Sequence, residues 1–287
     1  MDGILLINKE KNYTSRDIVN IISKELNTKK VGHTGTLDPI ATGVLVICVG
    51  SSTKLVEYLT STYKEYEAEI VLGIKTDTGD ITGNILKEEK VKIEKEQIEK
   101  VLKNMTKEYY QTVPIYSAVK VNGKKLYEYA RNNESVDLPK RKVDIKELEL
   151  ISNITYYNNK TIFKIRTLVS KGTYIRSLIE DIASSLNTIG TMKNLVRTKQ
   201  GDFNLKDCYT IEDIKNNKYN FITKEEALKN FYTVEVDEYL EKKIKNGCIL
   251  NNIYNKDLIL FKKDGKILAT YKNYQKEKGK IKPDKMF

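Results

Sequence analysis

The chain has 287 residues, of which 40% are hydrophobic and 31% are charged. This composition is typical of a globular protein and excludes a disordered or fibrous chain. No apolar run approaches the roughly 18 residues of a membrane helix, and the acidic Asp2 does not suit a signal peptide, so we expect a cytoplasmic protein with no membrane partner. The formal net charge of +11 favours a polyanionic partner such as nucleic acid, although a lysine-rich proteome would produce the same excess.

Residues that bind metals or form disulfides are few and scattered. The three cysteines, Cys48, Cys208 and Cys248, form no C-x-x-C pair, and His33 is the one histidine. This count excludes the HExxH metalloproteases and, unless His33 takes part, most Ser-His-Asp sites. The chain also lacks the G-x-x-x-x-G-K-[ST] pattern of a phosphate-binding loop. We therefore expect no metal ion and no cofactor.

The first part of the chain predicts strands alternating with helices. Thr14 and Asp17 have the spacing of a capping box, and apolar residues at helical spacing follow them. Between residues 64 and 73 apolar and acidic residues alternate, which predicts a half-buried strand with Tyr66 on its apolar face. The elements expected in this part are a strand at 3–8, a helix reaching Leu26, a Gly- and Thr-rich loop at 30–43, a strand at 44–49, a helix at 51–59 and the strand at 64–73.

The rest of the chain predicts a second group of elements and a small terminal domain. Periodicity predicts helices around 98–105, from Thr173 and at 237–245, and strands near 142–151, 161–169, 258–262 and 266–271. The stretch from Gln111 to Arg131 has no clean period, and we expect a strand-loop-helix excursion there. The pattern weakens around residues 221–231. The sequence thus predicts a mixed α+β fold, with a large domain at 1–231 carrying an insertion at about 111–140, and a small, mostly β domain at 232–287.

Three residues are candidates for chemistry from their surroundings alone. Asp38 precedes a proline in the Gly- and Thr-rich loop, where backbone donors can orient a carboxylate near a ligand, but an ordinary turn has the same composition. Tyr66 equally fits a plain core tyrosine. Arg176 lies near the start of its helix, where its charge opposes the helix dipole. Its place in a lysine-rich chain favours bidentate binding of a carboxylate, although a solvated surface arginine is the commoner case.

Taken together, these segments resemble the TruB family of tRNA pseudouridine synthases. The loop and strand at 32–45 (GHTGTLDPIATGVL) closely resemble the family signature. The other matching blocks follow in the family's order and spacing: GILLINK at 3–9, KEYEA at 64–68 with LG at 72–73 and TDTGD at 76–80, PIYSAVK at 114–120 with LYEYAR at 126–131, and SKGTYIRSL at 170–178. The resemblance extends from residue 3 to about residue 205.

The resemblance implies roles for individual residues. Asp38 matches the catalytic aspartate, Tyr66 the tyrosine that stacks on the target uracil, and Arg176 the arginine that pairs with the aspartate. The residues implied to bind the substrate are Lys9 near the site, His33 inserted into the RNA loop, Leu195 lining the base pocket, and Tyr174 and Arg197.

The resemblance also implies a fold and an activity. The fold would be a largely antiparallel-sheet pseudouridine synthase domain followed by a PUA-like RNA-binding domain. The activity would be isomerisation of the uridine at position 55 in the T-loop, by a monomer that binds the T-arm stem-loop of tRNA. Two departures, Val113 where the family has proline and Asn132 where it has glycine, concern the RNA-facing insertion rather than the aspartate. One alternative is a non-catalytic RNA-binding or RNA-folding module. Another is a phosphoryl-transfer enzyme, which the missing phosphate-loop pattern disfavours.

Overall fold

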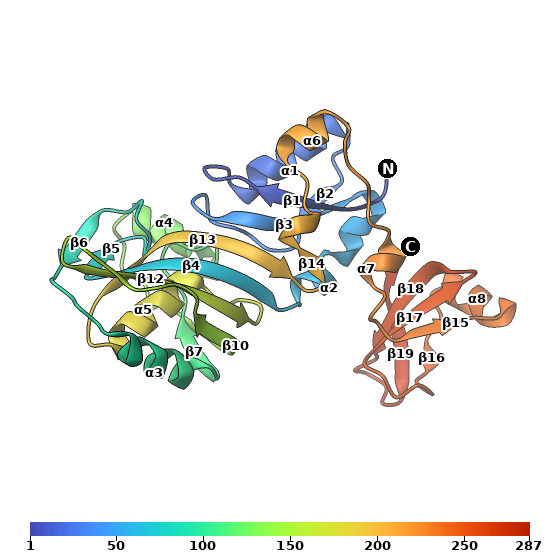
Figure 1. The fold of residues 1–287 in the computed structure, drawn as a ribbon. Coiled ribbons are helices and arrows are strands. Elements are labelled where there is room, and N and C mark those ends of the chain that lie inside the picture. Colours follow the sequence, from blue (N-terminus) through green and yellow to red (C-terminus); the bar gives the residue numbers. More distant parts are fainter.

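The computed structural model describes residues 1–287, which form two large sheets (Figure 1). The ten-stranded sheet has the order β1-β3-β13-β4-β12-β10-β7, with β2, β11 and β14 paired to β3, β12 and β13. The five-stranded sheet has the order β15-β17-β18-β19-β16, and β5-β6 and β8-β9 form two small hairpins. The predicted mixed α+β fold with a small, mostly β C-terminal part is confirmed.

The bounds of the elements are as follows. The strands are β1 (Gly3–Lys9), β2 (Val31–His33), β3 (Thr42–Val49), β4 (Lys64–Leu72), β5 (Ile74–Thr76), β6 (Ile85–Glu88), β7 (Glu108–Thr112), β8 (Lys120–Val121), β9 (Lys124–Lys125), β10 (Lys140–Leu150), β11 (Thr155–Tyr157), β12 (Lys160–Val169), β13 (Gly190–Gln200), β14 (Phe203–Asn204), β15 (Thr233–Glu235), β16 (Leu250–Asn251), β17 (Leu258–Lys263), β18 (Lys266–Asn273) and β19 (Lys280–Met286). The helices are α1 (Ser15–Glu25), α2 (Val56–Thr60), α3 (Lys95–Met105), α4 (Leu126–Arg131), α5 (Ile175–Ser185), α6 (Ile211–Lys215), α7 (Lys224–Ala227) and α8 (Glu238–Lys245), with short 3-10 helices η1 (Gly50–Leu55) and η2 (Leu205–Asp207).

The two halves of the large sheet meet where β3 runs parallel to β13. This is the one parallel pair of the sheet, and in it Gly43 faces Arg197. Gly43 has a φ of +102°, and a Cβ there would lie 2.2 Å from the carbonyl oxygen of Arg197. Only glycine permits this approach. The junction brings the loop that precedes β3, which carries Asp38, next to β4 and β13.

Helices cover the large sheet on both sides of this junction (Figure 1). Helices α3 and α5 pack on the β4-β12-β10-β7 part and bury the largest apolar cluster of the protein. Helices α1 and α6 pack on β1 and β3 and bury a second cluster. The opposite face of β1 and β3 packs against α2, and its cluster extends to Leu260 and Ile267 of the five-stranded sheet. The two sheets therefore share an apolar core.

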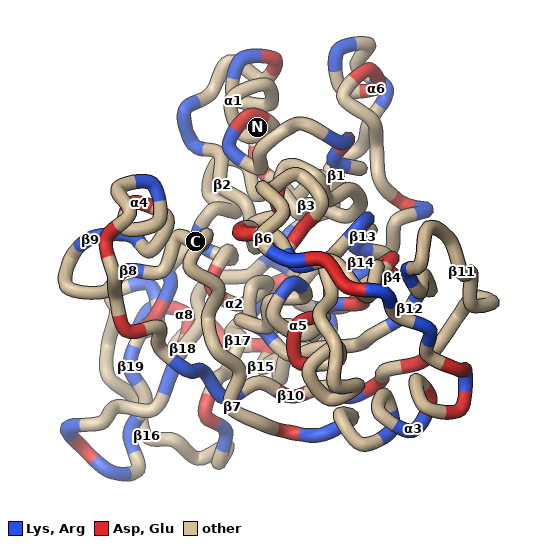
Figure 2. Tube along the Cα trace, turned by 90° about the vertical axis from the view of Figure 1, so that its left-hand side faces the viewer, with Lys and Arg blue, Asp and Glu red and all other residues tan.

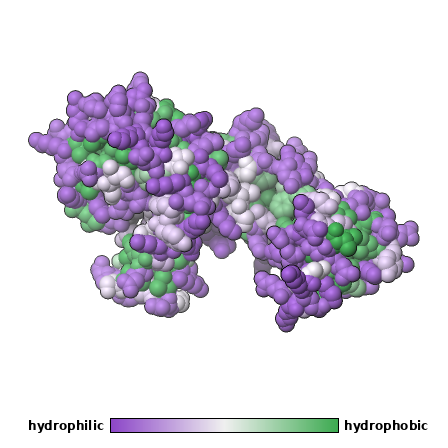
Figure 3. Space-filling view, turned by 90° about the horizontal axis from the view of Figure 1, so that it is seen from below, coloured by the Kyte–Doolittle hydropathy of each residue, from purple (hydrophilic) through white to green (hydrophobic).

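Polar contacts also join the five-stranded sheet to α2. The carboxylate of Glu57 lies 3.0 Å from the ammonium of Lys272 and 3.3 Å from that of Lys285. The hydroxyl of Tyr58 donates a hydrogen bond to Asp284. No helix is both long enough and apolar enough to span a membrane. The face seen in Figure 3 is mainly hydrophilic, with small scattered hydrophobic patches.

Most predicted elements are present, with local differences. The capping box is confirmed, because the amide of Asp17 donates to Oγ1 of Thr14 at 3.1 Å and the amide of Thr14 donates to Oδ2 of Asp17 at 2.8 Å. The expected loop at 30–43 begins with the short strand β2, and the expected helix at 51–59 starts as the 3-10 helix η1. Strand β13 has no counterpart among the predicted elements.

Candidate active site

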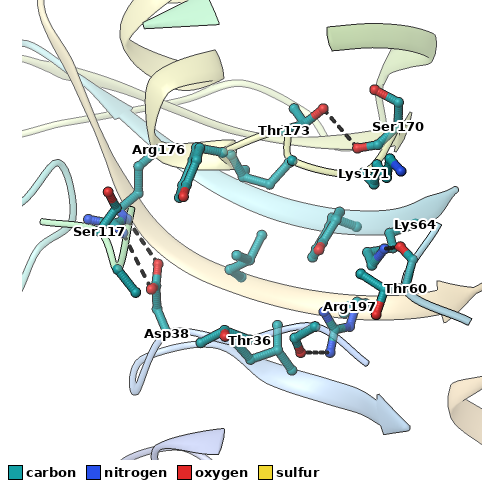
Figure 4. Close-up of a pocket in the computed structure, with 18 of the residues that line it drawn as sticks. Thr36, Asp38, Thr60, Lys64, Ser117, Ser170, Lys171, Thr173, Arg176 and Arg197 are labelled. Atoms are coloured by element: carbon teal, nitrogen blue, oxygen red, sulfur yellow. Dashed lines mark hydrogen bonds and ion pairs between the residues drawn. The ribbon is translucent and has the colours of Figure 1, made fainter. Parts of the chain in front are cut away.

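A pocket of about 330 Å³ opens between the Asp38 loop, the strands β4 and β13, and the start of α5 (Figure 4). Its volume is within the range of small-ligand sites. Of the predicted site residues, Asp38, Tyr66, Tyr174, Arg176, Leu195 and Arg197 line it, whereas Lys9 and His33 do not. The structure thus brings together six residues from four separate segments of the chain.

The carboxylate of Asp38 is fixed by Arg176. Nε of Arg176 lies 2.9 Å from Oδ2, and Nη2 donates to Oδ1 at 3.3 Å. The arginine side chain is 6% exposed and the aspartate side chain 34%, so the carboxylate faces the pocket while its partner is buried. The same guanidinium donates to the carbonyl oxygens of Thr78 at 2.8 Å and Tyr116 at 3.0 Å. These four acceptors offset the unfavourable position of a cation at the start of a helix.

Two buried polar side chains outside the pocket hold the loop that carries Asp38. The hydroxyl of Ser15 accepts from the amide of Leu37 at 2.8 Å and donates to its carbonyl at 3.2 Å. The ammonium of Lys9 is fully buried and donates to the carbonyl oxygens of Tyr13, at 2.6 Å, and Pro39, at 3.4 Å. Burial lowers the pKa of Lys9 to about 8, while the charge of Asp38 opposes this shift. Lys9 therefore supports the loop from outside the pocket, and its implied contact with the substrate stays a prediction.

Tyr66 and Leu195 form an apolar wall between β4 and β13. In the register of these strands Leu195 faces Ala68 and Arg197 faces Tyr66, and Tyr66 and Leu195 are both buried. The guanidinium of Arg197 lies 6.0 Å from the centre of the Tyr66 ring, within the range of a cation–π contact. Arg197 is also tied to the carbonyl oxygens of Val44, at 2.6 Å, and Gly35, at 3.1 Å. The ring of Tyr66 in this wall thus has a fixed cation within cation–π range.

His33 lies outside the pocket, at the end of β2. Its Nδ1 accepts a hydrogen bond from the amide of Gly35 at 3.3 Å, so the ring is neutral in this arrangement. Burial, with the charges of Arg197 and Arg16, lowers the pKa of His33. The contact with an RNA loop that the resemblance implies for His33 stays a prediction.

Gln111 is a site residue that the sequence analysis did not single out. It is 2% exposed, and its Oε1 accepts from the amide of Tyr174 at 2.8 Å while its Nε2 donates to the carbonyl of Tyr174 at 3.2 Å. Nε2 also donates to the hydroxyl of Tyr109, which donates to the carboxylate of Asp181. Burial raises the pKa of Asp181. This chain of hydrogen bonds links β7 to α5 and fixes the residue that caps the helix of Arg176.

Lys64 is the second residue that was missed. It lines the pocket two positions before Tyr66 on β4, and it is 7% exposed. Its position in the strand has the same parity as Tyr66, Ala68 and Ile70, and this parity is the signal that places it on the buried face.

Comparison with protein families identifies the class to which this fold and pocket belong. A model described as "TruB family pseudouridylate synthase (N terminal domain)" matches residues 23–175, and one described as "tRNA pseudouridylate synthase B C-terminal domain" matches residues 176–243. The chain belongs to the TruB family of pseudouridylate synthases.

Curated relatives and solved structures agree with this assignment. Proteins named tRNA pseudouridine synthase B from Bacillus cytotoxicus and Staphylococcus aureus are each 42% identical, over 100% of this chain and 97% and 99% of theirs. A structure titled "Structure of H/ACA RNP bound to a substrate RNA containing 2'-deoxyuridine" is similar with a TM-score of 0.72 and 23% identity, over 99% of this chain and 84% of that one. A "Cbf5-Nop10-Gar1 Complex" is similar with a TM-score of 0.73 and 24% identity, over 98% and 83%. At this identity the two structures show a shared fold.

Proposed function

We propose that this protein isomerises uridine to pseudouridine in tRNA. The observation that carries the proposal is the Asp38–Arg176 ion pair, which presents a partly exposed carboxylate to a pocket whose wall is Tyr66 and Leu195. The family and the names of the curated relatives support the same reaction. A non-catalytic RNA-binding module with this fold is not favoured, because it would have no need for a buried arginine that orients a carboxylate.

The reaction is an internal rearrangement that needs no redox partner. The bond between uracil N1 and the ribose C1′ breaks, the detached base rotates, and a bond forms between C5 and C1′. C5 then loses its proton and N1 gains one, so atoms and electrons balance. Asp38 serves as nucleophile or general base in this sequence, and Arg176 stabilises its ionised form.

The pocket wall retains the base while it is detached. Tyr66 offers its ring as a stacking surface and Leu195 excludes water from the other side, which prevents simple hydrolysis of the sugar. The hydroxyl of Tyr66 assists removal of the C5 proton. Tyr174, whose backbone is fixed by Gln111, closes the side of the pocket next to Arg176.

We further propose that the substrate is the uridine at position 55, in the T-loop of tRNA. A base within a folded loop has to flip out to enter the pocket, at a cost of a few kcal/mol, and His33 stacks in the space that it leaves. Figure 2 shows basic positions around β8, β9 and α4, in the insertion expected to face RNA. Lys124 and Arg131 there lie 4.7 and 5.3 Å from the ring centres of Tyr129 and Tyr127. Such cation–aromatic pairs suit an RNA backbone with exposed bases.

The C-terminal residues 232–287 are proposed to form an RNA-binding domain. Lys276, Lys278 and Lys282 are exposed there and available to phosphates. Their replacement by glutamine is a better test than truncation, because Leu260 belongs to an apolar cluster shared with β1 and β3. The triple variant is expected to bind tRNA more weakly and to keep its rate at saturating RNA. We expect the protein to work in the cytoplasm as a monomer. Size-exclusion chromatography with light scattering measures the oligomeric state.

The experiment that tests the function is pseudouridine mapping in an unmodified tRNA transcript after incubation with the protein. We expect one modified uridine, in the T-loop, and the same product from an isolated T-arm hairpin. Asp38→Asn is the matched negative control. A wild-type protein that binds the transcript but forms no pseudouridine would refute the proposal, and a reactive tRNA with an inert hairpin would place essential contacts outside the T-arm.

A further inference from the structure

One end of the pocket is lined by cations that have no carboxylate partner. Figure 4 shows Asp38, Arg176 and Ser117 together at one end, and Lys64, Thr60 and Arg197 at the other, with Lys171 above them. Of the four cations that line the pocket, Arg176 is paired with Asp38, the one acidic residue of the lining. Lys64, Lys171 and Arg197 form no salt bridge with any acidic residue. We call these three residues the cationic end of the pocket.

Lys64 is the buried centre of this cationic end. Its ammonium donates to the carbonyl oxygens of Thr60 at 2.9 Å and Thr62 at 3.1 Å, and it forms no salt bridge with a carboxylate. Burial lowers the pKa of Lys64 to about 8, and the charges of Arg197 and Lys171 add to this shift. Lysines are almost never buried without an anionic partner. An anion that enters the pocket would supply the missing one.

The other two cations are held in place by neutral oxygens alone. Arg197 uses Nε and Nη2 on the carbonyl oxygens of Val44 and Gly35, and the ammonium of Lys171 lies 3.2 Å from the hydroxyl of Ser61. Gly35 leaves room for the stem of Lys64, because a Cβ at this position would lie 3.3 Å from Cε of Lys64. Lys64 and Arg197 are therefore fixed by packing in the free protein, before any ligand arrives, whereas Lys171 is exposed.

We propose that Lys64 binds a phosphodiester group that flanks the flipped uridine, with Lys171 and Arg197 reinforcing the attraction. The proposal rests on the proposed function, in which the uracil lies against Tyr66. Lys64 and Tyr66 project from the same face of β4 two residues apart, a separation of about 7 Å along the strand. The base and the adjoining backbone of one nucleotide can then occupy the wall and the cationic end together. Asp38 at the opposite end keeps its own cation and does not compete.

The test combines a lysine variant with a neutral linkage in the RNA. T-arm hairpins carry one methylphosphonate, placed either 5′ or 3′ to the target uridine, which removes a single phosphate charge. Affinity is measured over a range of salt concentrations for the wild type, Lys64→Met and Lys64→Arg. Lys103→Met is the matched control, since Lys103 is an exposed residue of α3 away from this pocket.

We expect Lys64→Met to weaken binding of the normal hairpin by about tenfold and to reduce the slope of log affinity against log salt by about one. One of the two methylphosphonates should weaken wild-type binding by a similar factor and have no further effect on Lys64→Met. Lys64→Arg should recover part of the loss, and Lys103→Met should behave as the wild type.

Two results would overturn the proposal. The first is a wild-type protein whose affinity is indifferent to both methylphosphonates, a measurement that does not depend on any variant folding. The second is a Lys64→Met loss that simply adds to that of the methylphosphonate, which would mean that the two groups do not meet. Pseudouridine formation by the wild type on the normal hairpin is scored separately, so failure of the phosphate contact is distinguished from failure of the proposed function.

Discussion

Replacing Lys64 by methionine tests whether this lysine is held in the pocket at a cost to stability. The pKa of Lys64 falls from 10.5 to about 8 on folding, with burial as the main cause. Below about pH 8 both the folded and the unfolded chain carry the proton, and the fold bears the full cost of the buried charge. Between about pH 8 and pH 10.5 only the unfolded chain keeps the proton, so the free energy of unfolding rises with pH in this window.

The size of the effect follows from the shift. One pKa unit corresponds to about 1.4 kcal/mol, and a pH of about 9.5 lies about 1.5 units above the pKa in the fold. Relative to Lys64→Met, the wild type should therefore gain about 2 kcal/mol between about pH 7 and about pH 9.5. Methionine is unbranched and adaptable, so it fills the space of the lysine stem without titrating. Lys9, whose pKa is also lowered to about 8, is present in both proteins and cancels in the difference.

Urea unfolding followed by circular dichroism at the two pH values measures this difference. The free energy of unfolding of Lys103→Met, changed at an exposed position, should differ from that of the wild type by the same small amount at both pH values. If the difference in the free energy of unfolding between the wild type and Lys64→Met is the same at both pH values, Lys64 is solvated. That result would refute the claim that the fold holds this lysine in the pocket at a cost to stability.

Four further predictions concern the reaction. Arg176→Lys keeps the charge but cannot reach all four acceptors, so it should lower the free energy of unfolding by about 2–3 kcal/mol and remove most of the saturated rate. The control Arg166→Lys, in an exposed ion pair, should cost under about 0.5 kcal/mol, and urea unfolding measures both values. Asp38→Asn should form no detectable pseudouridine yet bind tRNA within about tenfold of the wild type; turnover near the wild-type rate would contradict its role. Gln111→Leu should lower both stability and the saturated rate, while the exposed Tyr110→Leu should change neither. Activity on a pre-formed hairpin should survive excess chelator; loss that one particular metal restores would contradict a metal-free mechanism.

Local patterns predicted the elements whose sequence matches their own surroundings. Helix α1 follows from its capping box, and β4 follows from the alternation of its residues, whose apolar face packs in one cluster with α3 and α5. Strand β13 was missed because it buries polar residues, whose hydrogen-bond partners lie in distant segments of the chain. Thr191 and Gln200 are buried and bond to Thr76 and Thr34, and the pairing with β4 is interrupted by two bulges that break the alternation. The hydropathy pattern of residues 190–200 carries no information about these distant partners, so it could not predict the strand.

The same distinction applies to the site. Asp38, Tyr66 and Arg176 were predicted because the family motifs mark them, and the structure places all three in one pocket. Gln111 is recognised only through what it contacts, and the strand parity of Lys64 indicates its burial but not its role. A buried glutamine is informative once both of its amide atoms are seen on the backbone of Tyr174, and a buried lysine once its neighbours prove to be two carbonyls and two cations.

Arg176, which the sequence marked, and Lys64, which it did not, both oppose local preference. Arg176 places a cation at the start of a helix and Lys64 places one inside a strand face, and each arrangement is unfavourable in isolation. Arg176 is compensated within the protein, by Asp38 and two carbonyl oxygens. Lys64 has two carbonyl oxygens and no charge to balance it. A fold that retains an uncompensated cation beside its reaction pocket sacrifices stability that a ligand can restore, and an RNA phosphate is the anion that this reaction brings to the pocket.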